Sequence, residues 1–169
     1  MIEVDPSTFE VRPFHVLDQQ WAILVGGKVR PNPMTVSWGG FGTLWNRPVL
    51  SVYVRPTRHT FACLTEHLEF TLNFLPEAQR TALDICGTVT GRDQETDKWE
   101  LAKIEPESAA RVLVPRVAGA ALVFECRVLG HVDLDPSHFN DRSLQKLYPQ
   151  KDYHRAFFGE VLGIFQTEK

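Results

Sequence analysis

Apolar and polar positions alternate along several short segments of the chain, the pattern of strands with one buried face. Met34, Val36 and Trp38 alternate with Thr35 and Ser37. Similar alternation, or a short apolar run ended by turn residues, predicts further strands over residues 21–25, 49–55, 69–75, 120–134 and 155–165, and a short one over 111–114. Most of the regular structure is therefore expected to be β.

The apolar period changes to that of a helix in two places. Phe61, Leu64 and Leu68 fall on one helical face, and Thr57 ahead of them is a favourable N-cap residue. A second helix is expected to start at Pro76-Glu77 and to end at Gly87.

The connecting segments differ in character. Residues 29–33 contain two prolines and predict a loop, and residues 88–98 form a polar loop. The polar connection over 135–152 is long enough to be functional or mobile. Residues 1–14 predict an irregular arm that Phe9, Val11 and Phe14 would pack onto the body. Gly159 and Gly163 predict a bend or bulge in the last strand.

Six or seven strands with two or three helices, and no regular βαβ alternation, indicate a mainly antiparallel β fold that can close into a barrel. The 169 residues, of which 43% are hydrophobic, suffice for one domain over 1–169. In the strand over 120–134, Cys126 is expected on the apolar face and Glu125 on the polar one.

Composition excludes several classes of function. A net charge of −3 and the lack of a basic run argue against nucleic acid as a partner. No apolar run is long enough for a membrane span, and the acidic N-terminus is not a signal peptide. Cys63, Cys86 and Cys126 stand far apart, which fits buried thiols in a cytoplasmic protein. The histidines show no metal-ligand spacing, so no metal site is expected.

Candidate chemistry gathers where the strand over 49–55 leads into the first helix. Arg55, Thr57, Arg58 and Thr60 crowd the helix start, where backbone N–H groups and the helix dipole favour an anion. This combination predicts a phosphate site, although both arginines could instead be ordinary solvated side chains.

The neighbouring strand carries a second set of candidates. The hydroxyls of Thr35 and Ser37 would offer polar contacts to a flat ligand, or would simply face solvent. The glycine-rich run over 39–42 predicts a close approach of the backbone to such a ligand. Met34 and Trp38 are expected in the core, and Asn32 to shape the preceding loop. The chain lacks the glycine fingerprints of Rossmann and P-loop nucleotide domains and the nucleophile motif of α/β-hydrolases.

The segment Asn32-Pro33-Met34-Thr35-Val36-Ser37-Trp38 resembles the N-x-M-T-x-S-W segment of flavin reductase-like, FMN-binding split-barrel proteins. The run over 54–60 is similar to the segment that follows in that family. Gly91-Arg92-Asp93 with Asp97-Lys98-Trp99 resembles a later S-G-R-D-x-D-K-F loop, with Thr90 in place of the serine and a longer spacer. Asp152-Tyr153-His154 with Gly159-Glu160-Val161 resembles G-D-H-x4-G-E-V, with Tyr153 in place of the aspartate.

This resemblance, over about residues 15–165, implies a split barrel that reduces flavin with NADH or NADPH. It implies a catalytic role for His154 and the FMN-binding residues Asn32, Met34, Thr35, Val36, Ser37, Trp38, Arg55, Thr57, Arg58, Thr60 and Lys98. Electrons would pass to oxygen, another flavin, a metal ion or a partner protein. The implied assembly is a homodimer in which both chains shape each pocket, and large apolar side chains support it: Trp21, Trp45, Trp99, Phe157 and Phe158.

Other interpretations stay open at this point. The protein could be a non-enzymatic FMN carrier, because Tyr153 departs from the pattern that would serve a nicotinamide. It could also be a split barrel that has turned to heme or pyridoxal phosphate. His154 could be a surface histidine at a strand start, and Lys98 an ordinary solvated lysine.

Overall fold

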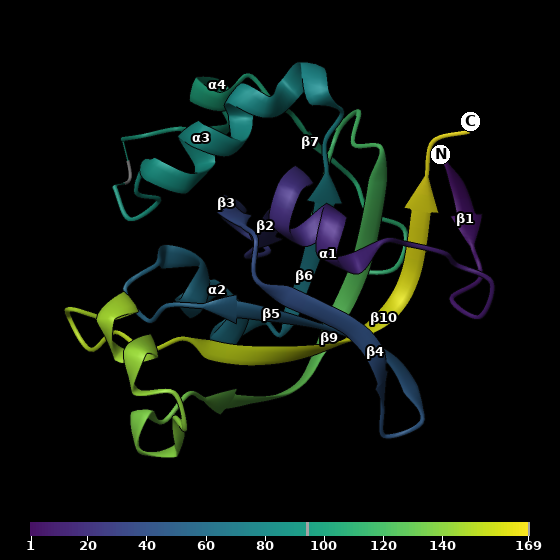
Figure 1. The fold of residues 1–169 in the computed structure, drawn as a ribbon. Helices are drawn as coiled ribbons and strands as arrows, with labels where there is room; N and C mark the ends of the chain where they lie inside the picture. Colours follow the sequence, from purple (N-terminus) through teal and green to yellow (C-terminus); the bar gives the residue numbers. More distant parts are fainter. Residues whose placement is uncertain (94, 169) are drawn as a thin grey trace.

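The computed structural model describes residues 1–93 and 95–168, and its centre is a curled antiparallel sheet (Figure 1). The sheet has the order β3-β2-β6-β9-β10-β5-β4, with β1 on the free edge of β10. Its strands are β1 (Ile2–Val4), β2 (Ala22–Gly26), β3 (Asn32–Val36), β4 (Gly39–Leu44), β5 (Arg47–Val54), β6 (Glu69–Phe74), β9 (Leu122–Asp133) and β10 (Arg155–Gln166). A separate pair joins β7 (Pro106–Glu107) to β8 (Arg116–Val117).

The helices are short and lie around the sheet. They are α1 (Pro13–His15), the π-turn η1 (Val16–Gln20), α2 (His59–His67), α3 (Arg80–Thr88), α4 (Lys98–Ala102) and the 3₁₀ turns η2 (Glu77–Gln79), η3 (Pro136–His138) and η4 (Arg142–Leu147). Figure 1 shows α3 and α4 together at one end, with η3 and η4 at the opposite end. Over the described part of the chain, no helix has the length and apolar character needed to cross a membrane.

Strand β2 separates two hydrophobic cores, which explains its continuous apolar sequence. Ala22 and Leu24 face the core inside the sheet, with Phe70, Phe124 and others. Ile23 and Val25 face a second core under α3, α4 and the segment between β7 and β9. Each side chain of β2 is therefore buried although successive side chains point to opposite faces.

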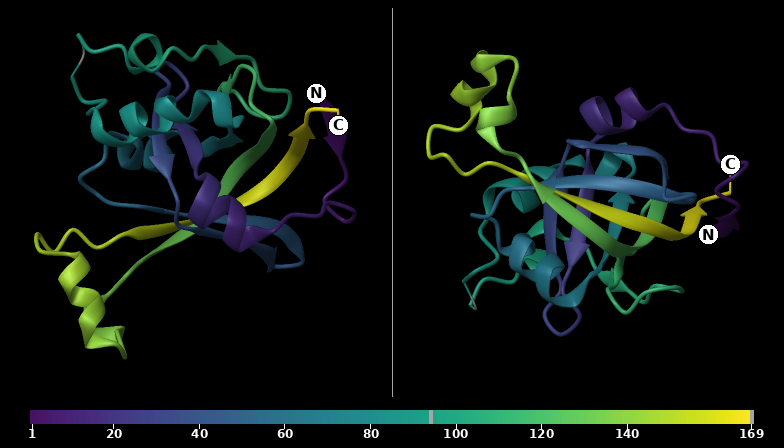
Figure 2. Two further views of the ribbon diagram at one scale, coloured as in Figure 1. Left: turned by 45° about the horizontal axis from the view of Figure 1, so that its top comes forward. Right: turned by 90° about the horizontal axis from the view of Figure 1, so that it is seen from below.

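The long strands β9 and β10 give the sheet its curvature. Their pairing shifts register between Phe158 and Gly159 and again between Val161 and Gly163, which confirms the bulges predicted from the two glycines. A Cβ on Gly159 would lie 2.5 Å from a ring carbon of Phe70, so the ring and the backbone can meet only at a glycine. The two strands run across the whole molecule and curl the sheet into an open barrel (Figure 2).

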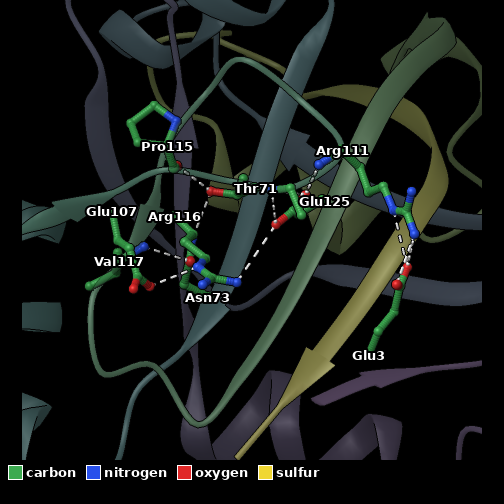
Figure 3. Close-up of polar contacts among 10 residues, drawn as sticks. Glu3, Thr71, Asn73, Glu107, Arg111, Pro115, Arg116, Val117 and Glu125 are labelled. Carbon is green, nitrogen blue, oxygen red and sulfur yellow. Dashed lines mark hydrogen bonds and ion pairs between the residues drawn. The ribbon is translucent and has the colours of Figure 1, made fainter. Parts of the chain in front are cut away.

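One prediction fails on the outer face of β9. Glu125 is fully buried rather than exposed, because the segment after β7 covers it (Figure 3). Its carboxylate accepts hydrogen bonds from the backbone N–H groups of Ala110 and Arg111, while Glu69 accepts one from Leu113 N–H. These N–H groups are already satisfied by side chains, so the strand predicted over 111–114 does not form.

A second difference concerns the glycine-rich run over 39–42. It forms strand β4, which pairs with β5 at the edge of the sheet. A Cβ on Gly39 would lie 2.6 Å from the carbonyl oxygen of Ser51, so this glycine permits the close approach of the neighbouring strand. Strand β3 also begins earlier than predicted, since Asn32 and Pro33 already pair with β2.

The N-terminal arm is partly as predicted. Phe9 and Val11 pack against the inner core, and residues 2–4 add the unpredicted strand β1. The side chain of Phe14, however, is 89% exposed. The three cysteines are free and buried, as expected.

Candidate functional site

Two adjoining cavities lie where β3, the start of α2 and the segment after α3 meet. The β3 cavity, of about 270 Å³, is lined by Met34, Thr35, Val36, Ser37, Trp38, Tyr53, Val54, Arg55, Arg58 and His154. The α2 cavity, of about 280 Å³, is lined by Asn32, Met34, Thr57, Arg58, His59, Thr60, Thr88, Val89, Thr90, Gly91 and Lys98. They share Met34 and Arg58, so every candidate predicted from the sequence lines at least one of them.

Strand β3 supplies the common wall of these cavities. Met34 and Val36 are buried, as the alternation predicts. The hydroxyl of Thr35 donates to the carbonyl oxygen of Leu83 on α3, so it ties the strand to the helix. Ser37 makes no hydrogen bond through its side chain among the described contacts and lines the β3 cavity. Trp38 was expected in the core but is 45% exposed, because the strand ends at Val36.

The start of α2 differs from the prediction. The N-cap residue is Arg58, not Thr57. Residues 55–58 form a turn closed by Arg58 N–H donating to the carbonyl oxygen of Arg55, and this turn places Thr57 outside the helix. The Thr57 hydroxyl instead points toward a carboxylate oxygen of Asp152, at 3.4 Å.

The guanidinium of Arg58 reaches across both cavities without a carboxylate partner among the described residues. It donates to the carbonyl oxygen of Gly87 at 2.6 Å and to the sulfur of Met34 at 3.4 Å. Burial, and then the nearby charge of Arg55, lower its pKa. A half-buried cation whose hydrogen-bond acceptors are neutral, and which lies near a second cation, favours binding of an anion.

Lys98 is the second cation of the α2 cavity. It is only 4% exposed, so the interpretation as a solvated lysine is wrong. Its ammonium donates to the carbonyl oxygen of Cys86 at 3.0 Å. Burial lowers its pKa to about 8, and the charge of Arg58 adds to this shift. Asp97 accepts hydrogen bonds from two N–H groups at the start of α4 and thereby fixes the position of Lys98.

Asn32 and Thr60 hold the two walls of the α2 cavity together. The amide nitrogen of Asn32 donates to the hydroxyl of Thr60 at 2.7 Å, and both side chains are buried. The amide also packs against the backbone of Gly91, where an added Cβ would collide with its oxygen. Asn32 therefore does more than shape a loop, since it joins β3, α2 and the segment after α3.

Arg55 is committed to a different contact from the one predicted. Its guanidinium donates to both carboxylate oxygens of Asp152 at 2.9 Å and to the carbonyl oxygen of Leu147 at 3.0 Å. It also lies 4.9 Å from the ring centre of Tyr148. Arg55 lines the β3 cavity but not the α2 cavity, so the predicted cluster of two arginines and two threonines is divided.

His154 is buried in the wall of the β3 cavity, against Trp38, with ring centres 4.8 Å apart. This position rules out a surface histidine. Its Nδ1 shares a hydrogen bond of 2.9 Å with the hydroxyl of Tyr148. Burial, and then the charge of Arg55, lower the pKa of His154 to about 4, so the ring is neutral near pH 7.

Several wall residues escaped the sequence analysis. Thr88, Thr90 and Gly91 line the α2 cavity with His59, whose pKa is lowered by burial and by nearby cations. The resemblance gave the only signal for Thr90 and Gly91, through the loop over 90–93, and for His59, through the run over 54–60. Tyr148 gave no signal, because it reaches the site only through the fold of the connection after β9.

A third, apolar cavity of about 650 Å³ adjoins the β3 cavity. It shares Ser37, Trp38 and Tyr53 with that cavity. Its other walls come from the N-terminal arm, η1, β4 and the segment after β9: Pro13, Phe14, Leu17, Asp18, Gly39, Gly40, Phe41, Leu134, Phe139, Leu144, Leu147 and Tyr148. Within residues 1–93 and 95–168, no cluster of histidine, cysteine, aspartate and glutamate is suited to a metal ion.

By fold, the protein is an antiparallel split β-barrel whose cavities lie between an edge strand and a helix start. Residues 19–169 match the family model of the flavin reductase like domain, and the chain therefore belongs to that family. Comparison with curated protein sequences gives no match.

Solved structures share this fold at low sequence identity. Flavoredoxin of Desulfovibrio vulgaris is 19% identical with a TM-score of 0.68, over 88% of this chain and 69% of its own. The NADH:FAD oxidoreductase of Streptomyces globisporus is 18% identical with a TM-score of 0.67, and the match covers 88% of this chain and 75% of that protein's chain. A split barrel domain protein of Shewanella frigidimarina is 15% identical with a TM-score of 0.70, over 96% and 77%.

Proposed function

We propose that the protein is a flavin-binding oxidoreductase that holds FMN across the β3 and α2 cavities and is reduced there by NADH or NADPH. The observation that carries this proposal is the pair Arg58 and Lys98, two buried or half-buried cations that face one cavity and have no carboxylate partner among the residues that the structure describes. A phosphate dianion would supply the missing countercharge. Membership of the flavin reductase like family supports flavin as the rest of the ligand.

The α2 cavity suits the phosphate end of such a ligand. Arg58 and Lys98 supply charge, and the hydroxyl of Thr90, which accepts from Arg92 N–H, supplies a neutral donor. The buried Asn32–Thr60 pair keeps the two walls at a fixed separation. Thr60 therefore acts by positioning rather than by direct contact.

The β3 cavity suits the flat ring system, because the polar side chain of Ser37 and the rings of Trp38 and His154 all line it. Bound FMN supplies the hydride and electron chemistry through its isoalloxazine ring. The protein contributes orientation and hydrogen bonds. We infer that Tyr148 donates to Nδ1 of the neutral His154, which leaves its Nε2–H as a donor.

The apolar cavity beside the β3 cavity is the proposed entry for the nicotinamide and for the electron acceptor, which would be oxygen, another flavin, a metal ion or a protein. The proposed assembly is a homodimer, since this cavity leaves large apolar side chains in water.

Replacing Arg58 by Ala tests the phosphate assignment. Losing charge-assisted hydrogen bonds of about 1.5–3 kcal/mol should weaken FMN by roughly one to two decades. Riboflavin, which lacks the phosphate, should bind as before. Flavin fluorescence titration measures the affinities for FMN and for riboflavin, with the exposed Arg142→Ala as the control. Equal losses for FMN and riboflavin would refute the assignment.

Anaerobic stopped-flow with bound FMN tests the reaction itself. NADH or NADPH should bleach the flavin absorbance, and His154→Ala should slow that step while the exposed His138→Ala should not. A flavin that binds but is never reduced would place the protein among the carriers. An absorption spectrum showing heme or pyridoxal phosphate would replace the proposal altogether.

A further inference from the structure

Aromatic side chains from separate segments of the chain form much of the wall of the apolar cavity. Its volume of about 650 Å³ lies within the range of sites that hold small organic ligands. Flat aromatic walls favour a ligand that is itself flat and aromatic. The rings are those of Phe14 in α1, Trp38 after β3, Phe41 in β4, Tyr53 in β5, and Phe139 and Tyr148 in the connection after β9.

Contacts among the rings fix part of this wall. Phe139 packs edge to face on Tyr153, with ring centres 5.8 Å apart, and Tyr153 lies 4.7 Å from the ring centre of Tyr148. The hydroxyl of Tyr148 shares its hydrogen bond with His154, and Trp38 packs on the same histidine. The wall is therefore ordered before a ligand arrives, which lowers the entropy lost on binding.

The apolar cavity differs from its two neighbours in charge. Arg58 lines both the β3 and the α2 cavities, together with Arg55 in the first and Lys98 in the second. Among the residues that the structure describes, no lysine, arginine or histidine lines the apolar cavity, and Asp18 is its one charged side chain. An anionic ligand would lose water there without gaining a countercharge, so an uncharged ligand is favoured.

Two hydroxyl groups mark the boundary between the apolar cavity and the β3 cavity. Ser37 and Tyr53 each line both cavities, and neither hydroxyl makes a hydrogen bond among the described contacts. A free hydroxyl can donate to a carbonyl oxygen. These two groups therefore favour an aromatic ligand that carries carbonyl oxygens over a plain hydrocarbon.

We propose that the apolar cavity binds quinones, which are flat, uncharged and carry two carbonyl oxygens, and that a quinone is reduced there. The inference rests on the proposed function, because the electrons come from NADH or NADPH by way of the flavin in the adjoining β3 cavity. In the overall reaction the quinone gains a hydride equivalent from NADH and a proton from solvent. Both of its oxygens become hydroxyls, and NADH becomes NAD⁺. The nicotinamide ring and the quinone would occupy the cavity in turn, and in the proposed dimer the partner chain would close its outer side.

Calorimetric titration of the full-length protein without NADH measures binding apart from turnover. Three probes with one ring system separate the contributions: naphthoquinone, naphthalene and naphthoquinone sulfonate. Naphthoquinone should bind about tenfold more tightly than naphthalene, which lacks the carbonyl oxygens. It should also bind about tenfold more tightly than the sulfonate, whose negative charge meets no cation in the cavity.

Two variants test the groups that would select the quinone. Tyr53→Phe removes one hydroxyl and should weaken naphthoquinone by about threefold to tenfold while leaving naphthalene unchanged. Tyr153→Phe is its control, because Tyr153 lines neither the apolar nor the β3 cavity. Leu144→Arg adds a cation to the wall and should tighten the sulfonate about tenfold, whereas Leu113→Arg, outside the cavity, should not.

The remaining outcomes separate this inference from the proposed function. Equal binding of naphthoquinone and naphthalene, both unaffected by Tyr53→Phe, would overturn the quinone site. With FMN bound and reduced anaerobically by NADH, naphthoquinone should restore the flavin absorbance several-fold faster than the sulfonate, although the sulfonate is the stronger oxidant. Equal rates would overturn the role of the quinone as acceptor and leave the proposed function standing. If no flavin binds, the proposed function falls and the acceptor role with it.

Discussion

Lys98 departs from the ordinary chemistry of a solvated lysine. Its ammonium is buried beside Arg58, so its charge is destabilised until an anion arrives, and its pKa falls to about 8 for that reason. The sequence could not show this burial. Asp97-Lys98 reads as the polar end of a loop, and only the fold turns the lysine inward over Cys86.

This shift predicts that FMN binding depends on pH. The protonated lysine binds the phosphate, so affinity should be highest between the second phosphate pKa of about 6 and the lysine pKa. Above pH 8 the free protein loses this proton, and affinity should fall by up to about tenfold per pH unit. Fluorescence titration from pH 6.5 to 9.5 measures the effect. The affinity of riboflavin for the wild-type protein should not change with pH, and neither should that of FMN for Lys98→Arg. A fall of affinity in both controls would contradict the assignment of Lys98 to the phosphate.

Gly91 is the other residue whose role is visible only in three dimensions. Its Cα lies so close to the Asn32 amide that Gly91→Ala must displace the amide and break its hydrogen bond to Thr60. A buried polar pair left unsatisfied costs about 1–3 kcal/mol. We expect urea unfolding to show that loss, together with weaker FMN binding. Gly42→Ala is the control, because a Cβ there meets nothing within 4 Å. If both variants were equally stable and bound FMN equally well, the close packing of Gly91 on Asn32 would have no effect on the site.

Among the elements, the connection between β9 and β10 is attached to the body of the protein by contacts that the sequence did not predict. Its length and polarity predicted a mobile or functional segment, and it does supply Tyr148 and walls of the apolar cavity. It is also fastened to the body by Arg55, through the carboxylate of Asp152 and the carbonyl oxygen of Leu147. Arg55 and Asp152 are 97 positions apart, so the sequence around either residue does not predict that they pair.

Asp152→Asn should release this fastening without touching the cations of the α2 cavity. The pair is largely sheltered, with side chains 29% and 10% exposed, so losing its charge-assisted bonds should cost about 1.5 kcal/mol. Limited proteolysis within residues 140–150 should accelerate about tenfold. Asp141→Asn keeps its cap on Ser143 N–H and serves as the control. Unchanged proteolysis would mean that Arg55 does not hold the connection.

The elements that the sequence predicted best are those whose pattern depends on burial alone. Strands β2, β5, β6, β9 and β10 follow from apolar runs, because the sheet lies between two cores. The unpredicted structure of residues 111–114 and 39–42 has a common cause. In both, distant groups decide the outcome: Glu125 takes the N–H groups of one segment, and the backbone of β5 pairs with the other.

At the scale of the whole molecule, the order of motifs along the chain predicted the family and the split barrel, and both are confirmed. The candidate site was predicted at the level of its residues but not of its geometry. All the candidates line two adjoining cavities, yet Arg55 and Thr57 turn toward Asp152 instead of joining Arg58. The carboxylate of Asp152, nearly a hundred residues away, attracts both side chains. The local sequence at the helix start does not predict that contact.

The surface of the single chain also leaves an apolar region in water. Around the apolar cavity, the side chains of Phe14, Trp38, Leu144 and Leu147 are 89%, 45%, 40% and 49% exposed. The N-terminal arm and the connection border this cavity but do not close it. Exposed apolar patches of this kind mark interfaces, and two-fold pairing is the commonest way of covering them. The Phe158 side chain is already in contact with Trp45 of its own chain, so it contributes less than the sequence indicated.

We therefore expect a homodimer that buries this region and completes each pocket with both chains. Light scattering on a sizing column at micromolar protein should give twice the chain mass of 19.2 kDa. Phe14→Asp places a charge in the buried interface and should shift the mass toward the monomer, with weaker flavin binding. Leu113→Asp puts the same charge on an equally apolar residue, 74% exposed in the segment between β7 and β8, and should leave the dimer intact. A wild-type monomer that still retains flavin would contradict both the dimer and the shared pocket.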